Sequence, residues 1–251
     1  ENLSLGSLFG WAAYTIYDDF LDDEGRPVTL GAANVALRRS IAAFGKALPD
    51  DMAFQALLDT TLDRIDTANT WEVMYARGVI AGSLLTINRL PDYGLLDQLA
   101  DRSAGHMLVA VGVARLAEYA LDSNEVRGLE GFFHHFLIAR QLNDDAHDWE
   151  ADLSRGHLSA VVTHLLQDAG VSGQVDVVAD RERLQQVFWQ TTIEWVSERI
   201  TNHCQQARQK LATNPLFQHP AEFEGWVDRL EAAAAQALSE RTTANDFIKT
   251  F

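Results

Sequence analysis

Apolar residues recur along most of the chain at intervals of three and four, the spacing that places them on one face of an α-helix. Short segments rich in Gly, Pro, Asp and Asn interrupt this pattern. The only strand-like run is the short QVDVV at 174–178. The pattern predicts helices over residues 3–22, 30–47, 54–65, 69–88, 94–121, 125–151, 158–167, 180–213 and 220–243.

The breaks between these helices are too short to act as linkers, and the sequence contains no internal repeat. We therefore expect residues 1–251 to form one all-α domain, folded as a single bundle. The chain begins with Glu1 instead of Met, so we also expect that some native residues precede it.

Charge narrows the range of partners. The 251 residues include 36 Asp and Glu against 20 Lys and Arg, a formal net charge of -16, and no basic run occurs. We therefore expect neither a nucleic-acid partner nor a membrane partner. No apolar run reaches the roughly 18 residues that a membrane-spanning helix needs. The single cysteine, Cys204, excludes an internal disulfide and fits a reducing compartment, so we expect a cytoplasmic protein.

Acidic residues are crowded in the segment YDDFLDDEGRP at 17–27. On a helix, Asp18 and Asp22 lie one turn apart, as do Asp19 and Asp23, so these carboxylates share one face. Like charges at this spacing repel by roughly 0.2–0.5 kcal/mol per pair. A bound cation would offset that repulsion and explain the crowding.

A second acidic stripe lies in QLNDDAHDWEADLSRGHLS at 141–159. Gln141, Asp145, Asp148 and Asp152 follow one another at spacings of four, three and four, which is a single line down a helix, and Asp144 lies beside it. The preceding segment, GLEGFFHHFLIAR, is apolar and aromatic. We therefore expect the stripe to face the interior of the bundle.

Two facing carboxylate stripes in a helical bundle are typical of a metal site built from adjacent helices. Carboxylate ligands without cysteine favour a hard ion, Mg²⁺ or alternatively Mn²⁺. A di-iron site would need a Glu-x-x-His repeat on paired helices, which is absent. Either stripe alone could be a solvated helix face, but the two together favour a metal–phosphate site.

These motifs resemble those of the class I isoprenoid synthases, the superfamily of trans-prenyltransferases, squalene/phytoene synthases and terpene cyclases. DDFLDD matches the first motif of that family, DDxxD, and QLNDDAHD resembles the QxxDDxxD motif of its polyprenyl synthetase branch. The resemblance extends over about residues 5–165 and implies roughly ten helices around a deep central cavity. It also implies three Mg²⁺ ions that bind an allylic diphosphate, with these metal ligands: Asp18, Asp19, Asp22, Asp144, Asp145 and Asp148.

By the same resemblance, all of these aspartates except Asp145 are the catalytic residues, and the diphosphate would contact Gln141, Arg102, Arg155 and His157. Aromatic rings could line the pocket and stabilise a carbocation, although each could equally be ordinary core. The candidates are Tyr14, Tyr17, Trp71, Tyr75, Phe132, Phe133 and Phe136. Tyr14 lies one turn before the first motif, where bulk limits chain length, so we expect a substrate of about ten to fifteen carbons.

Chain-elongating relatives bind a second substrate, isopentenyl diphosphate, through basic residues around the first motif. Here no basic residue precedes Asp18, Arg26 stands alone after the motif, and the pair at 38–39 lies further along. A second diphosphate therefore has few cations to bind it. We expect a class I terpene synthase, a diphosphate lyase that ionises one allylic isoprenoid diphosphate with Mg²⁺ and then cyclises it or eliminates a proton.

Three alternatives stay open. The second motif resembles that of prenyltransferases, which favours a chain-elongating or condensing trans-prenyltransferase. A non-catalytic helical subunit of a prenyl synthase could keep one motif, although both are present here. An acidic bundle that binds Ca²⁺ or a protein partner would have no EF-hand loop to support it. Dimers are common among the relatives, so the resemblance also allows a homodimer.

Overall fold

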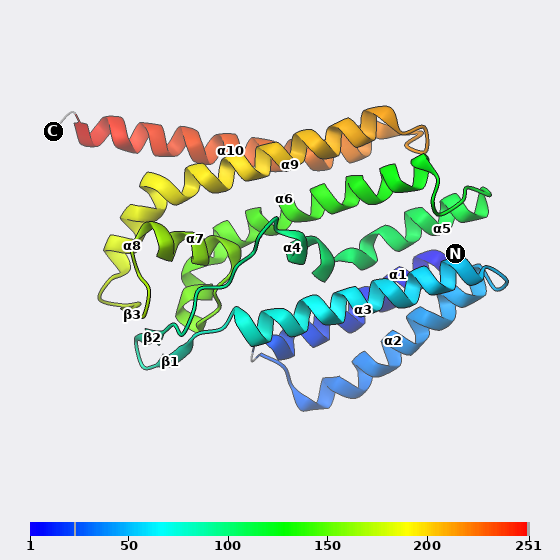
Figure 1. Ribbon diagram of the computed structural model, residues 1–251, viewed down its shortest axis with the longest axis horizontal. Coiled ribbons are helices and arrows are strands. Elements are labelled where there is room, and N and C mark those ends of the chain that lie inside the picture. The colour runs from blue at the N-terminus through cyan, green and yellow to red at the C-terminus, as the bar shows by residue number, and fades with distance from the viewer. Residues whose placement is uncertain (23, 250–251) are drawn as a thin grey trace.

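The computed structural model describes residues 1–22 and 24–249, so Asp23 of the first acidic segment lies outside the described residues. Most of the described chain is helical, as the sequence predicts (Figure 1). The helices are α1 (Asn2–Leu21), α2 (Pro27–Ala47), α3 (Met52–Tyr75), α4 (Asp97–Arg102), α5 (Leu108–Leu116), α6 (Asn124–Arg155), α7 (Ala160–Asp168), α8 (Arg181–Val187), α9 (Ile193–Thr213) and α10 (Pro220–Lys249). No helix in the described ranges is long and apolar enough to cross a membrane.

Helix α6 runs through the middle of the molecule. Figure 1 shows α1, α2 and α3 on one side of it and α9 and α10 on the other, and α6 also contacts α4, α5 and α7. Because helices surround α6, apolar residues on several of its faces are buried, among them Phe132, Ile138 and Leu142. This central position allows α6 to supply side chains to cavities on different sides.

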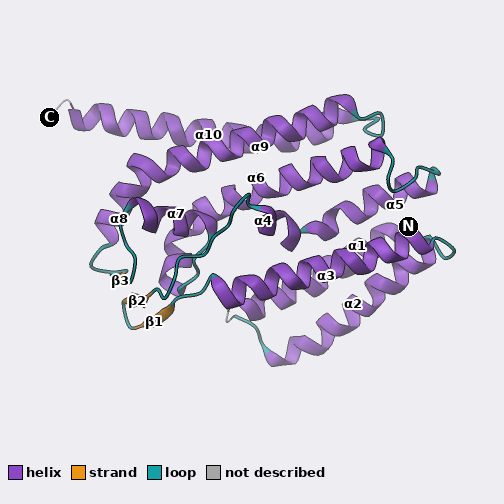
Figure 2. Cartoon of the chain, viewed as in Figure 1, coloured by secondary structure: helices purple, strands orange, loops and turns teal. Residues whose placement is uncertain are grey.

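A small sheet replaces the second half of the helix predicted over 69–88 (Figure 2). Strands β1 (Val79–Ala81) and β2 (Leu84–Thr86) form a hairpin, and β3 (Gln174–Asp176), within the strand-like run at 174–178, pairs with β2 antiparallel. Gly82 adopts a φ of 66° in the two-residue turn between β1 and β2. Glycine takes this left-handed conformation without strain, so the Gly-Ser pair specifies a hairpin where apolar spacing alone indicated a helix.

Three other predicted helices have different bounds. The helix predicted over 54–65 and the first part of the helix predicted over 69–88 form one continuous helix, α3. The Asp51 carboxylate caps the N-terminus of α3 by accepting a hydrogen bond from the Phe54 backbone N–H at 2.9 Å. The helix predicted over 94–121 is divided into α4, a 3₁₀ turn at Ala104–Met107 and α5. Ser103 and Gly105 lie at this division, and both are weaker helix formers than Ala or Leu. A π-helical turn at Phe188–Thr192 separates α8 from α9.

The chain leaving α3 pairs with the chain leaving α6. The Gly78 N–H donates to the Gly156 carbonyl and the Leu158 N–H donates to the Ala76 carbonyl, both at 2.8 Å. Gly156 has a φ of 77°, and a Cβ there would lie 2.8 Å from the Gly78 carbonyl oxygen. Only glycine fits this close approach, and the pairing fixes the C-terminal ends of α3 and α6 beside each other.

Candidate functional site

A cavity of about 340 Å³ separates the C-terminal end of α1 from the C-terminal half of α6. Asp18 and Asp19 of α1 line it from one side, and Gln141 and Asp144 of α6 line it from the other. The structure therefore brings members of both acidic motifs to one cavity, which we call the acidic cavity. Its remaining wall comes from α2, α3, the end of α4 and the turn before α5.

The acidic cavity is polar at one end and apolar at the other. Gly6, Gly10, Tyr14 and Asp18 follow one another every four residues on α1, so together they line the length of the cavity. Phe44 packs close to Gly6, three turns from Asp18, and marks the apolar end. Other apolar wall residues are Trp11, Leu62, Ile65 and Leu108, and the other polar ones include Arg102, Arg140, Gln141 and Asp144.

Arg102 joins the first motif to the neighbouring helix α3. Its Nη2 lies 2.7 Å from Asp18 Oδ1, its Nε donates to Asn69 Oδ1 at 3.2 Å, and its Nη1 contacts Glu72 Oε2. The Arg102 side chain is only 15% exposed. Burial disfavours the charged guanidinium, but Glu72 and Asp18 outweigh this and raise its pKa.

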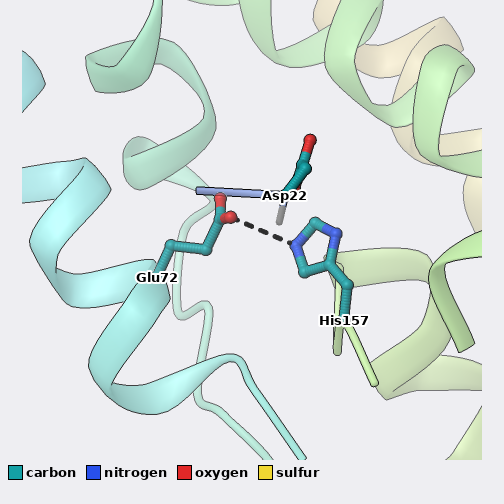
Figure 3. A group of neighbouring side chains, drawn as sticks. All are labelled: Asp22, Glu72 and His157. Atoms are coloured by element: carbon teal, nitrogen blue, oxygen red, sulfur yellow. Dashed lines mark ion pairs between the residues drawn. The ribbon is translucent and has the colours of Figure 1, made fainter. Parts of the chain in front are cut away.

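Glu72 is the buried centre of this network. Its Oε1 accepts from Arg77 Nη2 at 2.9 Å and lies 3.5 Å from His157 Nε2, and the same Arg77 nitrogen donates to Asp22 Oδ1 at 3.0 Å. Figure 3 shows the Glu72 carboxylate pointing toward the His157 ring, with Asp22 beside them. Ligand atoms of Asp22, Glu72 and His157 lie within 4.8 Å of one another, close enough to hold a metal ion, but Arg77 already satisfies both carboxylates.

The α6 stripe contains a buried carboxylate that is only half satisfied. Asp145 Oδ1 accepts from Gln141 Nε2 at 2.8 Å, whereas Asp145 Oδ2 has no hydrogen-bond partner among the described residues. Burial raises the pKa of Asp145 to about 7, and the nearby Asp152 acts in the same direction. A buried oxygen without a partner calls for an explanation, and either a proton on this carboxyl group or a bound cation would supply one.

Burial also raises the pKa of Asp18 on α1. Asp22 and Glu72 act in the same direction, and the guanidinium of Arg102 opposes them. Both acidic motifs therefore contain a carboxyl group that holds its proton more strongly than in water. Binding of a cation would displace such a proton and stabilise the ionised form.

Besides Asp145, four other predicted metal- or diphosphate-binding residues do not line the acidic cavity. Asp22 is bound to Arg77, and Asp148 is exposed on α6, one turn beyond Asp144. Arg155 pairs with Glu24 at 2.8 Å and approaches Asp152 at 3.5 Å. His157 lies between Glu72 and Asp152, with its Nδ1 3.4 Å from Asp152 Oδ1. Arg155 and His157, which the resemblance assigned to the diphosphate, therefore contact carboxylates.

Of the seven predicted aromatic residues, Tyr14 lines the acidic cavity and the other six do not. Its hydroxyl donates to Asp66 Oδ1 at 3.0 Å, which holds the ring in place. Tyr17 donates instead to Asn34 Oδ1 on α2 at 2.7 Å. The ring of Trp71 packs against Tyr93 and Tyr75, and Tyr75 is exposed to solvent. Neither Trp71 nor Tyr75 lines the acidic cavity.

The phenylalanines of α6 also lie elsewhere. Phe132 stacks on Phe136 and contacts Phe217 and Phe223, near the start of α10, whereas Phe133 lines a separate hollow beside Arg64. The rings expected to line a substrate pocket therefore do not line the acidic cavity. The physical reason is that α6 is buried on several faces, so apolar character did not reveal which partner each ring faces.

Sequence reasoning missed Glu72, Arg77 and Asn69. A signal for Glu72 exists in the spacing of buried residues along α3. Those residues alternate at intervals of four and three, and Glu72 occupies the next core position after Ala68. A charged residue in core register indicates a paired internal carboxylate, but the partners come from distant segments. The core register of α3 is 54, 58, 61, 65, 68 and 72.

Comparison with known proteins bears on the fold. No protein-family model and no curated protein matches the sequence. A solved structure, described as the apo form of an Arabidopsis medium/long-chain length prenyl pyrophosphate synthase, matches with a TM-score of 0.63. The match has 15% sequence identity and covers 96% of this chain and 81% of that chain, a likeness that shows the fold. The chain therefore has an isoprenoid synthase-like fold.

Proposed function

We propose that the protein is a Mg²⁺-dependent class I terpene synthase, a diphosphate lyase that ionises one allylic isoprenoid diphosphate and then cyclises it or eliminates a proton. The observation that carries this proposal is the polarity of the acidic cavity. Aspartates from both motifs lie at one end of it, and Phe44 and other apolar side chains line the other. An allylic diphosphate has the same polarity, with a charged head and a hydrocarbon tail.

The residues at the polar end fit Mg²⁺. The donors that line it are the carboxylate oxygens of Asp18, Asp19 and Asp144, which hard cations prefer. Asp145, which accepts from Gln141, has a second oxygen, Oδ2, with no protein partner in the described part of the chain. Asp18 and Asp19 would hold ions from the α1 side, joined by Asp22 when it exchanges Arg77 for a metal ion, and the α6 ligands would be Asp144, Asp145 and Asp148. When bound, Mg²⁺ neutralises the diphosphate and acts as a Lewis acid on the leaving oxygen.

The protein's own cations would then position the diphosphate. Arg102 is held at the polar end by Asp18 and Glu72. If Asp18 turns to a metal ion, the Nη2 of Arg102 becomes free to donate to a phosphate oxygen, a charge-assisted hydrogen bond. The Gln141 amide, which now donates to Asp145, could do the same, and Arg155 and His157 lie beside this end.

The apolar end would hold the prenyl chain and exclude water, which would otherwise quench a carbocation. The cavity volume of about 340 Å³ lies near the lower limit for ligand pockets, roughly 300–1,000 Å³, and supports a chain of about ten to fifteen carbons. The ring of Tyr14 could stabilise positive charge in its neighbourhood by roughly 0.5–2 kcal/mol.

The pairing of the arginines favours one diphosphate substrate over two. Arg77, Arg102 and Arg155 each form ion pairs with carboxylates. Among the described residues that line the acidic cavity, Arg140 is the arginine with no ion pair. One unpaired arginine would bind a second diphosphate only weakly.

A chain-elongating prenyltransferase is the second candidate. The spacing of Gln141, Asp144, Asp145 and Asp148 resembles the motif of that branch, and the matching solved structure is described as a prenyl pyrophosphate synthase. Arg140 would then contact the second diphosphate.

Analysis of the reaction products distinguishes a terpene synthase from a chain-elongating prenyltransferase. The purified chain is incubated with Mg²⁺ and allylic diphosphates of ten, fifteen or twenty carbons, with and without isopentenyl diphosphate. Extracts are analysed by gas chromatography–mass spectrometry before and after phosphatase treatment. We expect a terpene hydrocarbon or alcohol from the allylic substrate alone. A longer prenyl alcohol, formed only with isopentenyl diphosphate and seen only after phosphatase, would identify a prenyltransferase, and no product under any condition would contradict both.

A further inference from the structure

A second cavity, of about 690 Å³, lies between the segment at 90–97 and helices α6, α7 and α9. It shares no lining residue with the acidic cavity, although α6 contributes to both. Its distinguishing feature is a set of histidines from three helices, so we call it the histidine cavity. They are His134 and His135 of α6, His164 of α7 and His203 of α9.

Two of these histidines face each other across the contact between α6 and α9. The Nδ1 atoms of His135 and His203 are 3.1 Å apart, and the centroids of their rings are 5.3 Å apart. The ring of His134 lies 5.1 Å from that of His135, and its Nε2 is 3.3 Å from Asp97 Oδ1. The other histidine, His164, stacks on Trp195 with ring centroids 4.1 Å apart.

Burial favours the neutral form of both facing imidazoles. Burial lowers the pKa of His135 to about 4, and the neighbouring histidines act in the same direction. Burial likewise lowers the pKa of His203, with His134 and Arg199 acting in the same direction and Asp97 opposing them. The two rings are hydrogen bonded to each other through these Nδ1 atoms, so one of them carries a proton there that a bound metal ion would displace.

We propose that His135 and His203 form a binding site for a divalent transition-metal ion of the Zn²⁺ and Co²⁺ class, a second metal site in this chain. At metal–nitrogen distances of about 2.0–2.1 Å, two nitrogens 3.1 Å apart subtend an angle of about 100° at the metal. This angle is close to that of a tetrahedral centre. The cavity has room for water to complete the coordination shell.

His134 and Asp97 lie beside this pair. A carboxylate close to one nitrogen of a histidine restrains the orientation of the ring. Here Asp97 stands at the N-terminal end of α4 and would keep the His134 ring beside the metal-binding pair. We assign His134 a positioning role, because only the nitrogens at 135 and 203 are in direct contact.

Imidazole nitrogens suit Zn²⁺, Co²⁺ and Ni²⁺, whereas Mg²⁺ takes oxygen ligands. A site in the histidine cavity would therefore select a different metal from the acidic cavity. An ion held there would also cross-link α6 to α9, the two helices that supply its ligands.

The test is a titration of the full chain with Co²⁺ in the presence of excess Mg²⁺, so that Mg²⁺ fills the carboxylate ligands first. We expect one equivalent of Co²⁺ to produce the visible absorption bands of a four-coordinate complex, and Zn²⁺ to displace it. His135→Ala and His203→Ala should each weaken Co²⁺ binding by at least about tenfold. The exposed His219, just before α10, provides a matched control, because His219→Ala should bind Co²⁺ as the unmodified protein does.

A thermal measurement guards against variants that lose binding because they misfold. Zn²⁺ should raise the unfolding temperature of the unmodified protein and of His219→Ala, but not that of His203→Ala. His203→Gln, which keeps a polar side chain of similar size, replaces His203→Ala if circular dichroism shows that the alanine variant is unfolded.

The variant Asp144→Asn tests whether the two cavities bind metal independently. Because Asp144 lines only the acidic cavity, this variant should keep the cobalt bands whatever its effect on prenyl diphosphate chemistry. The proposal is overturned if both histidine variants keep the cobalt bands at the original affinity. It is also overturned if the bands disappear in Asp144→Asn, or if Co²⁺ binds only as a six-coordinate complex with oxygen ligands.

Discussion

The acidic cavity is lined at its polar end by carboxylates and arginines, whereas the histidine cavity is lined by imidazoles. Both take side chains from α6, the first from Gln141 and Asp144 and the second from His134 and His135, about two turns earlier. One helix can therefore serve two sites of different chemistry, because residues a few turns apart face different neighbouring helices.

The two cavities also differ in charge. Near the acidic cavity, Glu72, Arg77 and Arg102 form a network of ion pairs, and Asp145 keeps one oxygen without a partner among the described residues. In the histidine cavity, burial lowers the pKa of both His135 and His203 and so favours the neutral rings. The contrast teaches that ligand type and protonation together select the metal: ionised carboxylates favour Mg²⁺, and neutral imidazoles favour transition metals.

Removal of a carboxylate from the acidic cavity should have the largest effect. We expect Asp144→Ala or Asp19→Ala to lower turnover of an allylic diphosphate by roughly a thousandfold, because several kcal/mol of charge stabilisation are lost. Release of inorganic diphosphate measures this, and circular dichroism should show an intact fold. Asp59→Ala, at an exposed position of α3, is the control and should react normally. Normal turnover by both cavity variants would rule out the metal assignment.

Disruption of the ion-pair network should lower stability. Glu72→Gln leaves Arg77, Arg102 and His157 without their shared buried carboxylate, so we expect the free energy of unfolding to fall by about 3 kcal/mol. Glu150→Gln weakens an exposed pair with Arg181 and should cost less than about 1 kcal/mol. Chemical denaturation measures both values. Equal losses would mean that Glu72 is not the centre of a buried network.

The stability of the metal-free protein should depend on pH through Asp145. Its pKa is about 7 in the folded protein, above the ordinary value of 3.8, so the folded state binds the proton more tightly than the unfolded state. The contribution of Asp145 to stability is therefore complete below about pH 4 and is lost as the pH rises through about 7.

We expect the unmodified protein to lose on the order of 2 kcal/mol relative to Asp145→Asn across this range of pH. Denaturation of both proteins at several pH values in a chelator measures the difference, and saturating Mg²⁺ should reduce it. Parallel pH profiles of the two proteins would show that Asp145 does not titrate in this range.

The smallest effect should come from the apolar wall of the acidic cavity. Tyr14→Ala enlarges the cavity and should shift preference toward a longer prenyl chain by about tenfold in kcat/KM. Tyr17→Ala is matched to it, since Tyr17 lies one turn away on the same helix but binds Asn34. Competition between substrates of fifteen and twenty carbons gives the ratio. A similar shift in both variants would remove Tyr14 from the wall that limits chain length.

The sequence predicted what depends on regular spacing. Intervals of three and four placed Asp18 and Asp19 on α1, and Gln141 and Asp144 on α6, and these four line one cavity. The same reasoning could not choose between partners for Phe132 or Phe136, because α6 is buried on several faces. The apolar spacing also predicted a helix through Gly82, where the left-handed conformation of this glycine forms the turn of a hairpin instead.

Long-range contacts were beyond the sequence. Arg102 meets Asp18 across 84 positions of the chain, and His135 meets His203 across 68. Neither histidine lies in a ligand-spacing motif, so the pair becomes visible only when α6 packs against α9. Pairings of this kind depend on tertiary packing, which helical periodicity does not specify.

The central claim is that the acidic cavity binds a prenyl diphosphate through metal ions held by both acidic motifs. The most direct test is calorimetric titration with an unreactive allylic diphosphate analogue of fifteen carbons, with Mg²⁺ and with a chelator. We predict binding that requires Mg²⁺, is lost in both Asp19→Ala and Asp144→Ala, and is unchanged in His203→Ala. Equal binding with and without Mg²⁺, or undiminished binding by both aspartate variants, would contradict the account.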